Sequence, residues 1–219
     1  MKKLNQYRGF LTSEQIVAGI TAAKKNAARL AEDAEILLKI GRYPSACSLA
    51  VLSLEESGKT TILRNMATAI EQKDILDLWK SYRRHLDKHI LTLLPDRAAK
   101  GARLLREFRD CVTDATLDEK AAYDAVKQIG FYTDCLDNAH WSIPSIVVDE
   151  ELARSIVTNA KIASSGSHTV TVREIELWII HMQAGYTRQN LVAWAKAMEG
   201  EKLQPEGYAE EMANFSKGL

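Results

Sequence analysis

The residues best suited to chemistry are three cations and two histidines that lie close together in the chain: Arg83, Arg84, His85, Lys88 and His89. On a helix, residues four apart share one face, so both imidazoles would face the same way. Guanidinium and ammonium groups can neutralise a phosphate, and an imidazole can move a proton near neutral pH. The segment therefore predicts a phosphate-binding patch. A solvated basic helix face, with His89 covering the edge of the core, is an equally weighted alternative.

The spacing of His85 and His89 is also that of a two-histidine metal site. The zinc-protease motif H-E-x-x-H would require a glutamate where Leu86 stands, so that motif is not met. We therefore expect no metal and no cofactor.

A second segment, E-E-S-G-K-T-T, resembles half of a phosphate-binding P-loop. The first glycine of that motif would fall at Ser53, and a strand should precede it where the pattern here is helical. Glu55 and Lys59 are four residues apart with the acid first, which favours a helical ion pair. Because they lie among apolar residues, we interpret them as a partly buried structural pair.

The apolar spacing predicts the helices that position these residues. Thr12 and Gln15 form a capping-box pattern that starts the first helix, and Pro44 suits the start of the second. A turn at 41–43 separates them. Helices are expected over about 13–40, 44–70, 74–94, 96–112, 117–128, 150–163, 172–184 and 187–199, with irregular or short extended segments near 130–134 and 141–144 and a polar, frayed tail from 204.

Composition limits the partners and the compartment. The 219 residues contain 29 basic and 29 acidic side chains, so an RNA site would have to be a local patch. The cysteines Cys47, Cys111 and Cys135 form no C-x-x-C pair and are expected to be reduced thiols. No apolar stretch suits a signal peptide or a membrane span, so we expect a cytoplasmic protein.

Three stretches resemble a known family. Residues 34–46, A-E-I-L-L-K-I-G-R-Y-P-S-A, and 49–59, L-A-V-L-S-L-E-E-S-G-K, resemble the first helical hairpin of HEPN domains. The E-E-x-G-K ending, followed by a tryptophan at 79 and R-x-H-x-x-K at 83–88, is similar to the AbiV family of phage abortive-infection proteins. Residues 127–134, K-Q-I-G-F-Y-T-D, with a later W-x-x-P, also fit that family. The resemblance covers about 31–163.

The resemblance implies a site as well as a fold. HEPN domains are helical bundles that commonly dimerise, and many are metal-independent ribonucleases with R-x(4–6)-H at the dimer cleft. Arg84 and His89 satisfy that motif, as do Arg83 and His89. The family-like segment instead stresses Arg83, His85 and Lys88, so both registers stay open. Arg84 would stabilise charge on the phosphate, His89 or His85 would transfer protons, and Arg83 and Lys88 would bind RNA.

The sequence thus predicts an all-α protein with a HEPN-type antiparallel helical bundle. We expect a core over 12–112, a helical extension packed on it over 113–203, and a polar tail over 204–219. The expected function is that of an abortive-infection effector acting on RNA or translation, with metal-independent endoribonuclease activity as the leading hypothesis. The partners would be a second copy, an RNA substrate and a phage or host protein trigger. The alternatives are a non-catalytic helical protein that binds a phage or host protein and a nucleotide-binding HEPN module.

Overall fold

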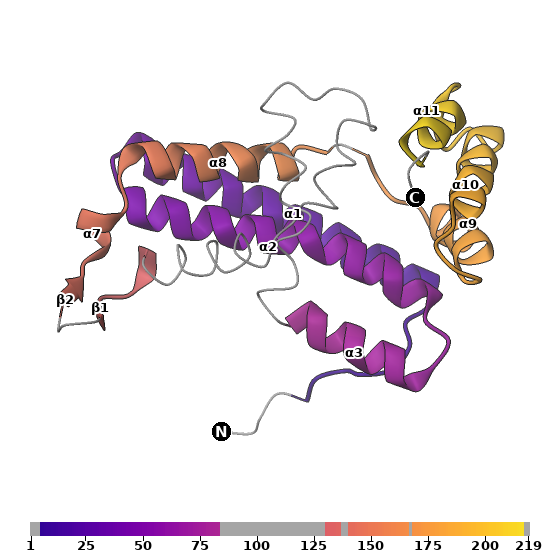
Figure 1. Ribbon diagram of the computed structural model, residues 1–219, viewed down its shortest axis with the longest axis horizontal. Coiled ribbons are helices and arrows are strands. Elements are labelled where there is room, and N and C mark those ends of the chain that lie inside the picture. The colour runs from indigo at the N-terminus through magenta and orange to yellow at the C-terminus, as the bar shows by residue number, and fades with distance from the viewer. Residues whose placement is uncertain (1–4, 84–129, 137–139, 167, 217–219) are drawn as a thin grey trace.

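The computed structural model describes residues 5–83, 130–136, 140–166 and 168–216, and two long antiparallel helices are its centre (Figure 1). Helix α1 (Ser13–Lys39) and helix α2 (Tyr43–Thr68) lie side by side and are joined by a tight turn. Gly41 occupies this turn with a φ of +74°, a conformation that glycine adopts without steric cost. The predicted hairpin of two long helices is therefore confirmed.

The start of α1 follows the predicted capping box. The Gln15 backbone N–H donates to Thr12 Oγ1 at 3.3 Å, and the Thr12 N–H donates to Gln15 Oε1 at 3.0 Å. These bonds satisfy two backbone donors that the first helical turn leaves without an intrahelical partner. The helix then buries one apolar seam: Ile16, Ile20, Ala23, Ala27, Leu30, Ala31 and Ala34.

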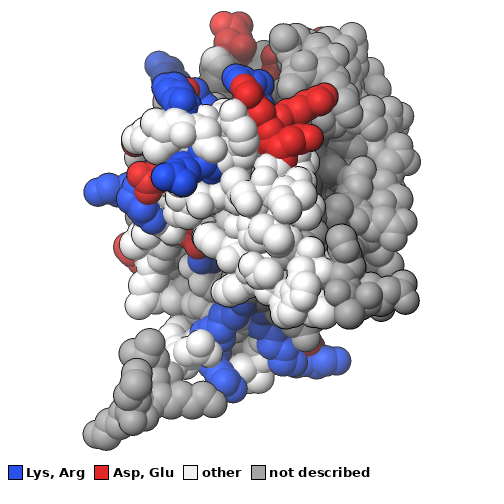
Figure 2. Space-filling model, turned by 90° about the vertical axis from the view of Figure 1, so that its left-hand side faces the viewer, with Lys and Arg blue, Asp and Glu red and all other residues white. Residues whose placement is uncertain are grey.

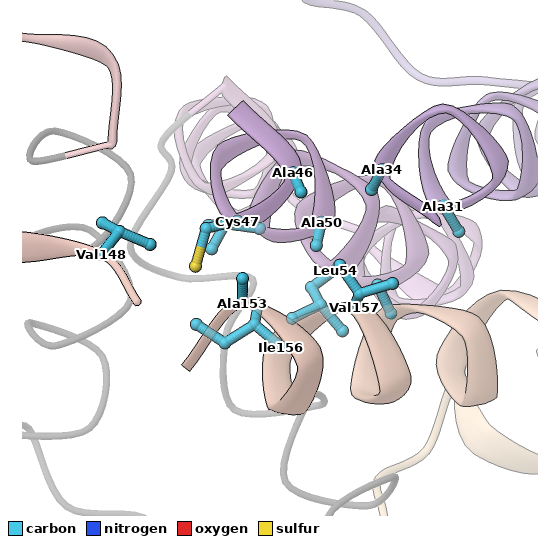
Figure 3. Packing of buried hydrophobic residues seen from close by; sticks show 12 residues of the cluster. Ala31, Ala34, Ala46, Cys47, Ala50, Leu54, Val148, Ala153, Ile156 and Val157 are labelled. Atoms are coloured by element: carbon cyan, nitrogen blue, oxygen red, sulfur yellow. The ribbon is translucent and has the colours of Figure 1, made fainter. Parts of the chain in front are cut away.

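Helix α8 (Glu150–Ser164) packs against α1 and α2 at one end of the pair, and the three helices share a core rich in small residues (Figure 3). Small side chains let helix backbones approach closely. A hydrogen bond shows how close the two backbones are, because the Ser53 hydroxyl on α2 donates to the Ala27 carbonyl of α1 at 2.7 Å. The fully buried members of this core are Ala34, Ala46, Cys47, Ala50, Val51, Leu54, Ala153 and Ala160.

A second core lies at the other end of the pair, where α3 (Gln72–Arg83) and α9 (Val172–Met182) pack against α1 and α2. Its buried members are Ile16, Ile20, Ile62, Leu63, Met66, Ile75, Trp79, Val170 and Ile175. Helix α2 is thus buried by partners on several sides along its length.

The C-terminal helices build a third cluster. Helix α10 (Arg188–Gly200) packs against both α9 and α11 (Tyr208–Phe215). The expectation of a frayed polar tail from residue 204 is wrong in this respect, because α11 buries Met212 in the cluster. Its apolar face spans only two turns, which is too short to stand out from a polar background in the sequence.

Strand structure is confined, within the described residues, to one small hairpin. Strand β1 (Asp134–Leu136) pairs antiparallel with β2 (His140–Ser142), and Cys135 lies opposite Trp141. Helix α7 (Pro144–Val147) follows and leads into α8. The prediction of short extended segments here, and of an all-α class for the chain as a whole, is confirmed. None of the described helices is long and apolar enough to cross a lipid bilayer.

Part of the predicted organisation falls elsewhere. The helices expected at 96–112 and 117–128, and the boundary between core and extension at 112/113, lie outside the described residues. Helix α8, which the sequence assigned to the extension, packs directly on α1 and α2.

Candidate functional site

The last described turn of α3 carries Arg83, the first residue of the predicted basic site. Its guanidinium carbon lies 4.8 Å from the centroid of the Trp79 ring, a cation–π arrangement. Nη1 donates to the Trp79 carbonyl at 3.4 Å, and Nη2 donates to the Tyr7 carbonyl. Arg83 therefore ties the N-terminal segment to α3 through two of the five donors that a guanidinium offers.

Trp79 is the anchor of this corner. Its indole Nε1 donates to the Gly9 carbonyl at 2.9 Å. Tyr7 and Tyr82 meet its ring edge-on, at centroid distances of 6.0 and 5.4 Å. Edge-to-face aromatic contacts of this kind add stability beyond the area they bury. The residues just before position 84 are thus held rigidly by both the helix and the N-terminal segment.

The predicted structural ion pair lies on α2 beside this corner. Glu55 is 3% exposed, in keeping with a structural role. Lys59 Nζ binds the carboxylate of Glu56, where the sequence had predicted Glu55 as the acid. The side chains of Glu56 and Lys59 are 18% and 17% exposed, so they share a face that is more open than the one holding Glu55. A lysine on a helix can reach the residue three positions earlier as well as the residue four positions earlier. Lys59 can therefore pair with Glu56 as readily as with Glu55.

Lys59 also connects α2 to α3. Its ammonium lies 5.0 Å from the centroid of the Tyr82 ring. The charge of Lys59 is therefore balanced by a carboxylate and by an aromatic face. Glu56, Lys59 and Tyr82 therefore form one cluster between α2 and α3. Tyr82 and Arg83 immediately precede the predicted residues 84–89 in the chain.

The remaining predicted site residues are Arg84, His85, Lys88 and His89, and they lie outside the described residues. Their roles, and the choice between the two registers, stay predictions.

Cys47 is excluded as a nucleophile by its surroundings. It is fully buried in the core shared by α1, α2 and α8. Burial, together with the nearby charge of Asp149, raises the pKa of its thiol to about 12. The thiolate is the reactive form of cysteine, so this side chain acts as a small apolar residue at neutral pH.

Sequence reasoning missed one polar site. A cavity of about 320 Å³ lies between α1, α2 and the segment that follows α8, and it is lined by Lys24, Arg64 and His168. Each of these side chains is an ordinary surface type in its own segment. The separation of 144 residues between Lys24 and His168 hid their proximity.

Comparison with known proteins gives one match. The model of the HEPN family described as AbiV matches residues 15–164, from the first turn of α1 to the end of α8. No curated protein and no solved structure matches the chain. The matched span includes the basic segment 83–89, and it ends before α9.

Proposed function

Since the chain belongs to the AbiV family of HEPN proteins, we propose that it is an abortive-infection effector that acts on RNA as a metal-independent endoribonuclease. The family match over residues 15–164 carries this proposal. The sequence supplies the chemistry, because Arg84 and His89 fit the R-x(4–6)-H spacing within the matched span. The rigid corner around Trp79 supports it further, since it fixes the helix turn from which that segment continues.

In the proposed mechanism the basic segment performs phosphoryl transfer within the RNA chain. His89 takes the proton of a ribose 2′-hydroxyl, whose oxygen then attacks the adjacent phosphorus. The bond from phosphorus to the 5′-oxygen breaks, and that oxygen receives a proton from a histidine. Arg84 stabilises the negative charge on the phosphate, and Arg83 and Lys88 hold the backbone.

His85 is the alternative proton-transfer group. It belongs to the R-x-H-x-x-K register formed with Arg83 and Lys88. Arg83 already donates to two backbone carbonyls, which supports a positioning role for it. Replacement of single histidines separates the two registers.

The proposed enzyme is a homodimer. One basic segment supplies few cations for an RNA backbone in a protein of zero formal charge, whereas two segments across a two-fold axis would build one cleft. Light scattering at micromolar concentration should give twice the mass of the 24.5 kDa chain. A monomer would contradict this part of the proposal.

The test combines RNA cleavage with phage protection. Purified protein should cut RNA in the presence of EDTA, and Arg84→Ala and His89→Ala should each lower the rate by about 10²–10⁴-fold, as loss of a general acid or base does. Arg29→Ala and His181→Ala, on α1 and α9, are the matched controls and should keep wild-type activity. A severe His85→Ala and a mild His89→Ala would select the R-x-H-x-x-K register.

A second function is favoured by an exposed apolar surface at the end of the molecule that carries the hairpin and α7. Figure 2 shows a broad uncharged area on this end. Tyr132, Trp141 and Ile146 are 62%, 60% and 75% exposed. Exposed apolar patches of this kind mark protein-binding surfaces. The alternative proposal is a non-catalytic helical protein that binds a phage or host protein there.

Two variants separate these functions. Full protection by the Arg84→Ala, His85→Ala, His89→Ala triple variant would overturn the ribonuclease proposal. Loss of protection in a Trp141→Ser, Ile146→Ser variant that keeps its melting temperature would then support the binding protein.

A further inference from the structure

The cavity beside Lys24 has a mixed lining that suits a charged ligand. Its volume is about 320 Å³. Lys24 of α1, Arg64 of α2 and His168 of the α8–α9 connection supply basic groups, while Ser57 and Thr61 of α2 supply hydroxyls. Apolar side chains complete the wall: Ile20, Ala27, Ala163 and Val170. Polar groups that converge within a partly apolar wall are typical of a small-molecule site.

The two cations of the cavity are close enough to repel one another. Burial lowers the pKa of Lys24, and the positive charge of Arg64 lowers it further, while Glu174 acts in the opposite direction. The Lys24 ammonium donates a hydrogen bond to the His168 carbonyl. A carbonyl carries no net charge, so this bond does not neutralise the positive charge of Lys24. An anion between Lys24 and Arg64 would therefore be stabilised by both.

Glu174 is the acidic side chain near the cavity, and it is already engaged. Its Oε1 lies 2.6 Å from His168 Nε2, and its Oε2 accepts from the Thr171 N–H at 2.6 Å. It is 3% exposed. The carboxylate therefore fixes the α8–α9 connection and the start of α9, and only part of its charge acts on Lys24.

Arg64 is oriented by aromatic contacts. Its guanidinium carbon lies 5.8 Å from the centroid of the Trp178 ring, and its carbonyl accepts from Trp178 Nε1 at 3.2 Å. Within the described residues, no carboxylate lies within ion-pairing distance of the guanidinium. Its hydrogen-bond donors are thus positioned and retain capacity for an anionic ligand.

Ser57 belongs to the lining of the cavity and carries a hydroxyl that is closed to solvent. Its Oγ is buried and has no hydrogen-bond partner in the described part of the chain. A buried hydroxyl without a partner costs free energy that a bound acceptor would recover.

We propose that this cavity binds a small phosphorylated molecule, with its phosphate held between Lys24 and Arg64. Phosphate matches two cations and several hydroxyl donors better than a monoanionic carboxylate does, because it offers more charge and more acceptor oxygens. Ligand pockets begin at about 300 Å³, so the cavity suits a ligand of sugar-phosphate or mononucleotide size. The site is independent of the ribonuclease proposal, since none of its residues lies in 83–89.

Calorimetry on the full chain tests the site with three phosphate probes: inorganic phosphate, ribose 5-phosphate and adenosine 5′-monophosphate. We expect saturable binding of at least one probe and none of adenosine, which lacks the phosphate. The probe that binds most tightly shows whether the phosphate belongs to a free ion, a sugar phosphate or a nucleotide. Binding of RNA with no binding of any small probe would overturn the proposal.

Variants assign the binding to this cavity. Lys24→Gln and Arg64→Gln should each weaken binding at least tenfold. Lys25→Gln is the matched control, because it removes the same charge from the exposed neighbouring position of α1 and should bind as the wild type does. Unchanged affinity in Lys24→Gln and Arg64→Gln, or an equal loss in Lys25→Gln, would overturn the assignment.

The melting temperature of each unliganded variant is the control for folding. Should Arg64→Gln lower it below the assay temperature, Lys24→Gln and Arg64→Lys decide the question. Lys24→Gln should still lose affinity, and Arg64→Lys should retain more affinity than Lys24→Gln does. Because the readout is binding of small molecules, a negative result here leaves the RNA-cleavage test unaffected.

Discussion

The two ends of the chain solve the same packing problem with different residues. In the core shared by α1, α2 and α8, alanines dominate, and the helix backbones come close enough for Ser53 to bond the Ala27 carbonyl. In the cluster of α9, α10 and α11, Trp194 is central and meets Trp178 and Tyr208 edge-on at centroid distances of 5.1 and 5.9 Å. One region is packed by closely approaching backbones, the other by large aromatic side chains that contact one another edge-on.

The family match follows this division. It covers residues 15–164 and ends with α8, so the aromatic cluster lies beyond it. The two regions are joined by polar contacts as well as apolar ones: Trp178 donates to the Arg64 carbonyl, and the Tyr186 hydroxyl donates to Asn65 Oδ1 at 2.7 Å. The comparison suggests that α9–α11 are an addition docked on the end of α2, and that the alanine core carries the fold common to the family.

The largest expected effect on stability comes from truncating one buried side chain in each region, which creates a cavity there. Leu54 and Met198 are 0% and 1% exposed. Leu54→Ala should lower the free energy of unfolding by about 3–5 kcal/mol, because alanine neighbours have no rotamers with which to refill the space. Met198→Ala should cost about 2–3 kcal/mol, because the surrounding long and aromatic side chains can relax. Urea unfolding measures both.

The exposed Ile36 of α1 provides the control for this pair. It is 58% exposed, and Ile36→Ala should change stability by less than about 0.5 kcal/mol. Equal losses for Leu54→Ala and Met198→Ala would show that the two regions do not differ in how well they relax.

Much of the first region could be predicted from sequence. The seam from Ile16 to Ala34 repeats every three or four residues, the capping box at Thr12 marks the start, and Gly41 marks the turn. These signals involve residues close together in the chain, so they can be read from a single sequence. The acid bonded to Lys59 was misassigned because helical ion pairs form at a spacing of three residues as well as four, each worth only about 0.2–0.5 kcal/mol, so the spacing does not choose between Glu55 and Glu56.

The second region and the Lys24 cavity were harder to predict for a common reason. Helix α11 is defined by the burial of Met212 against α10, and the cavity by the meeting of Lys24, Arg64 and His168. Both depend on tertiary contacts between different segments, which the hydrophobic period of a single helix does not encode. Of the basic site itself, residue chemistry predicted the segment, the resemblance supplied the two catalytic registers, and the structure adds the placement of Arg83 against Trp79.

A smaller effect is expected from the buried carboxylates, of which the described residues hold one in each region: Glu55 in α2 and Glu174 in α9, each 3% exposed. Glu55→Ala should lower stability by about 1–3 kcal/mol, because its buried surroundings lose a hydrogen-bonding group. Thermal unfolding with Glu174→Ala alongside compares the two regions. A Glu55→Ala protein with the wild-type melting temperature and no activity would instead move Glu55 into the active site.

The smallest expected effect concerns a motif that both regions share. Helices α1 and α9 each begin with a threonine capping box, in which the N–H of the third helical residue donates to the Thr12 hydroxyl at 3.3 Å and to the Thr171 hydroxyl at 3.2 Å. Thr12→Ala should cost about 1 kcal/mol.

Thr171→Ala should cost more, up to about 2 kcal/mol. Its box uses Glu174, whose buried carboxylate also holds His168, so loss of the cap loosens the α8–α9 connection as well as the helix start. Thr12→Ser and Thr171→Ser keep the hydroxyl and should retain most of the stability. Thermal unfolding of the four variants gives the ranking. If Thr12→Ala proved the more costly, α1 would depend on its cap more than α9 does, despite its long buried seam.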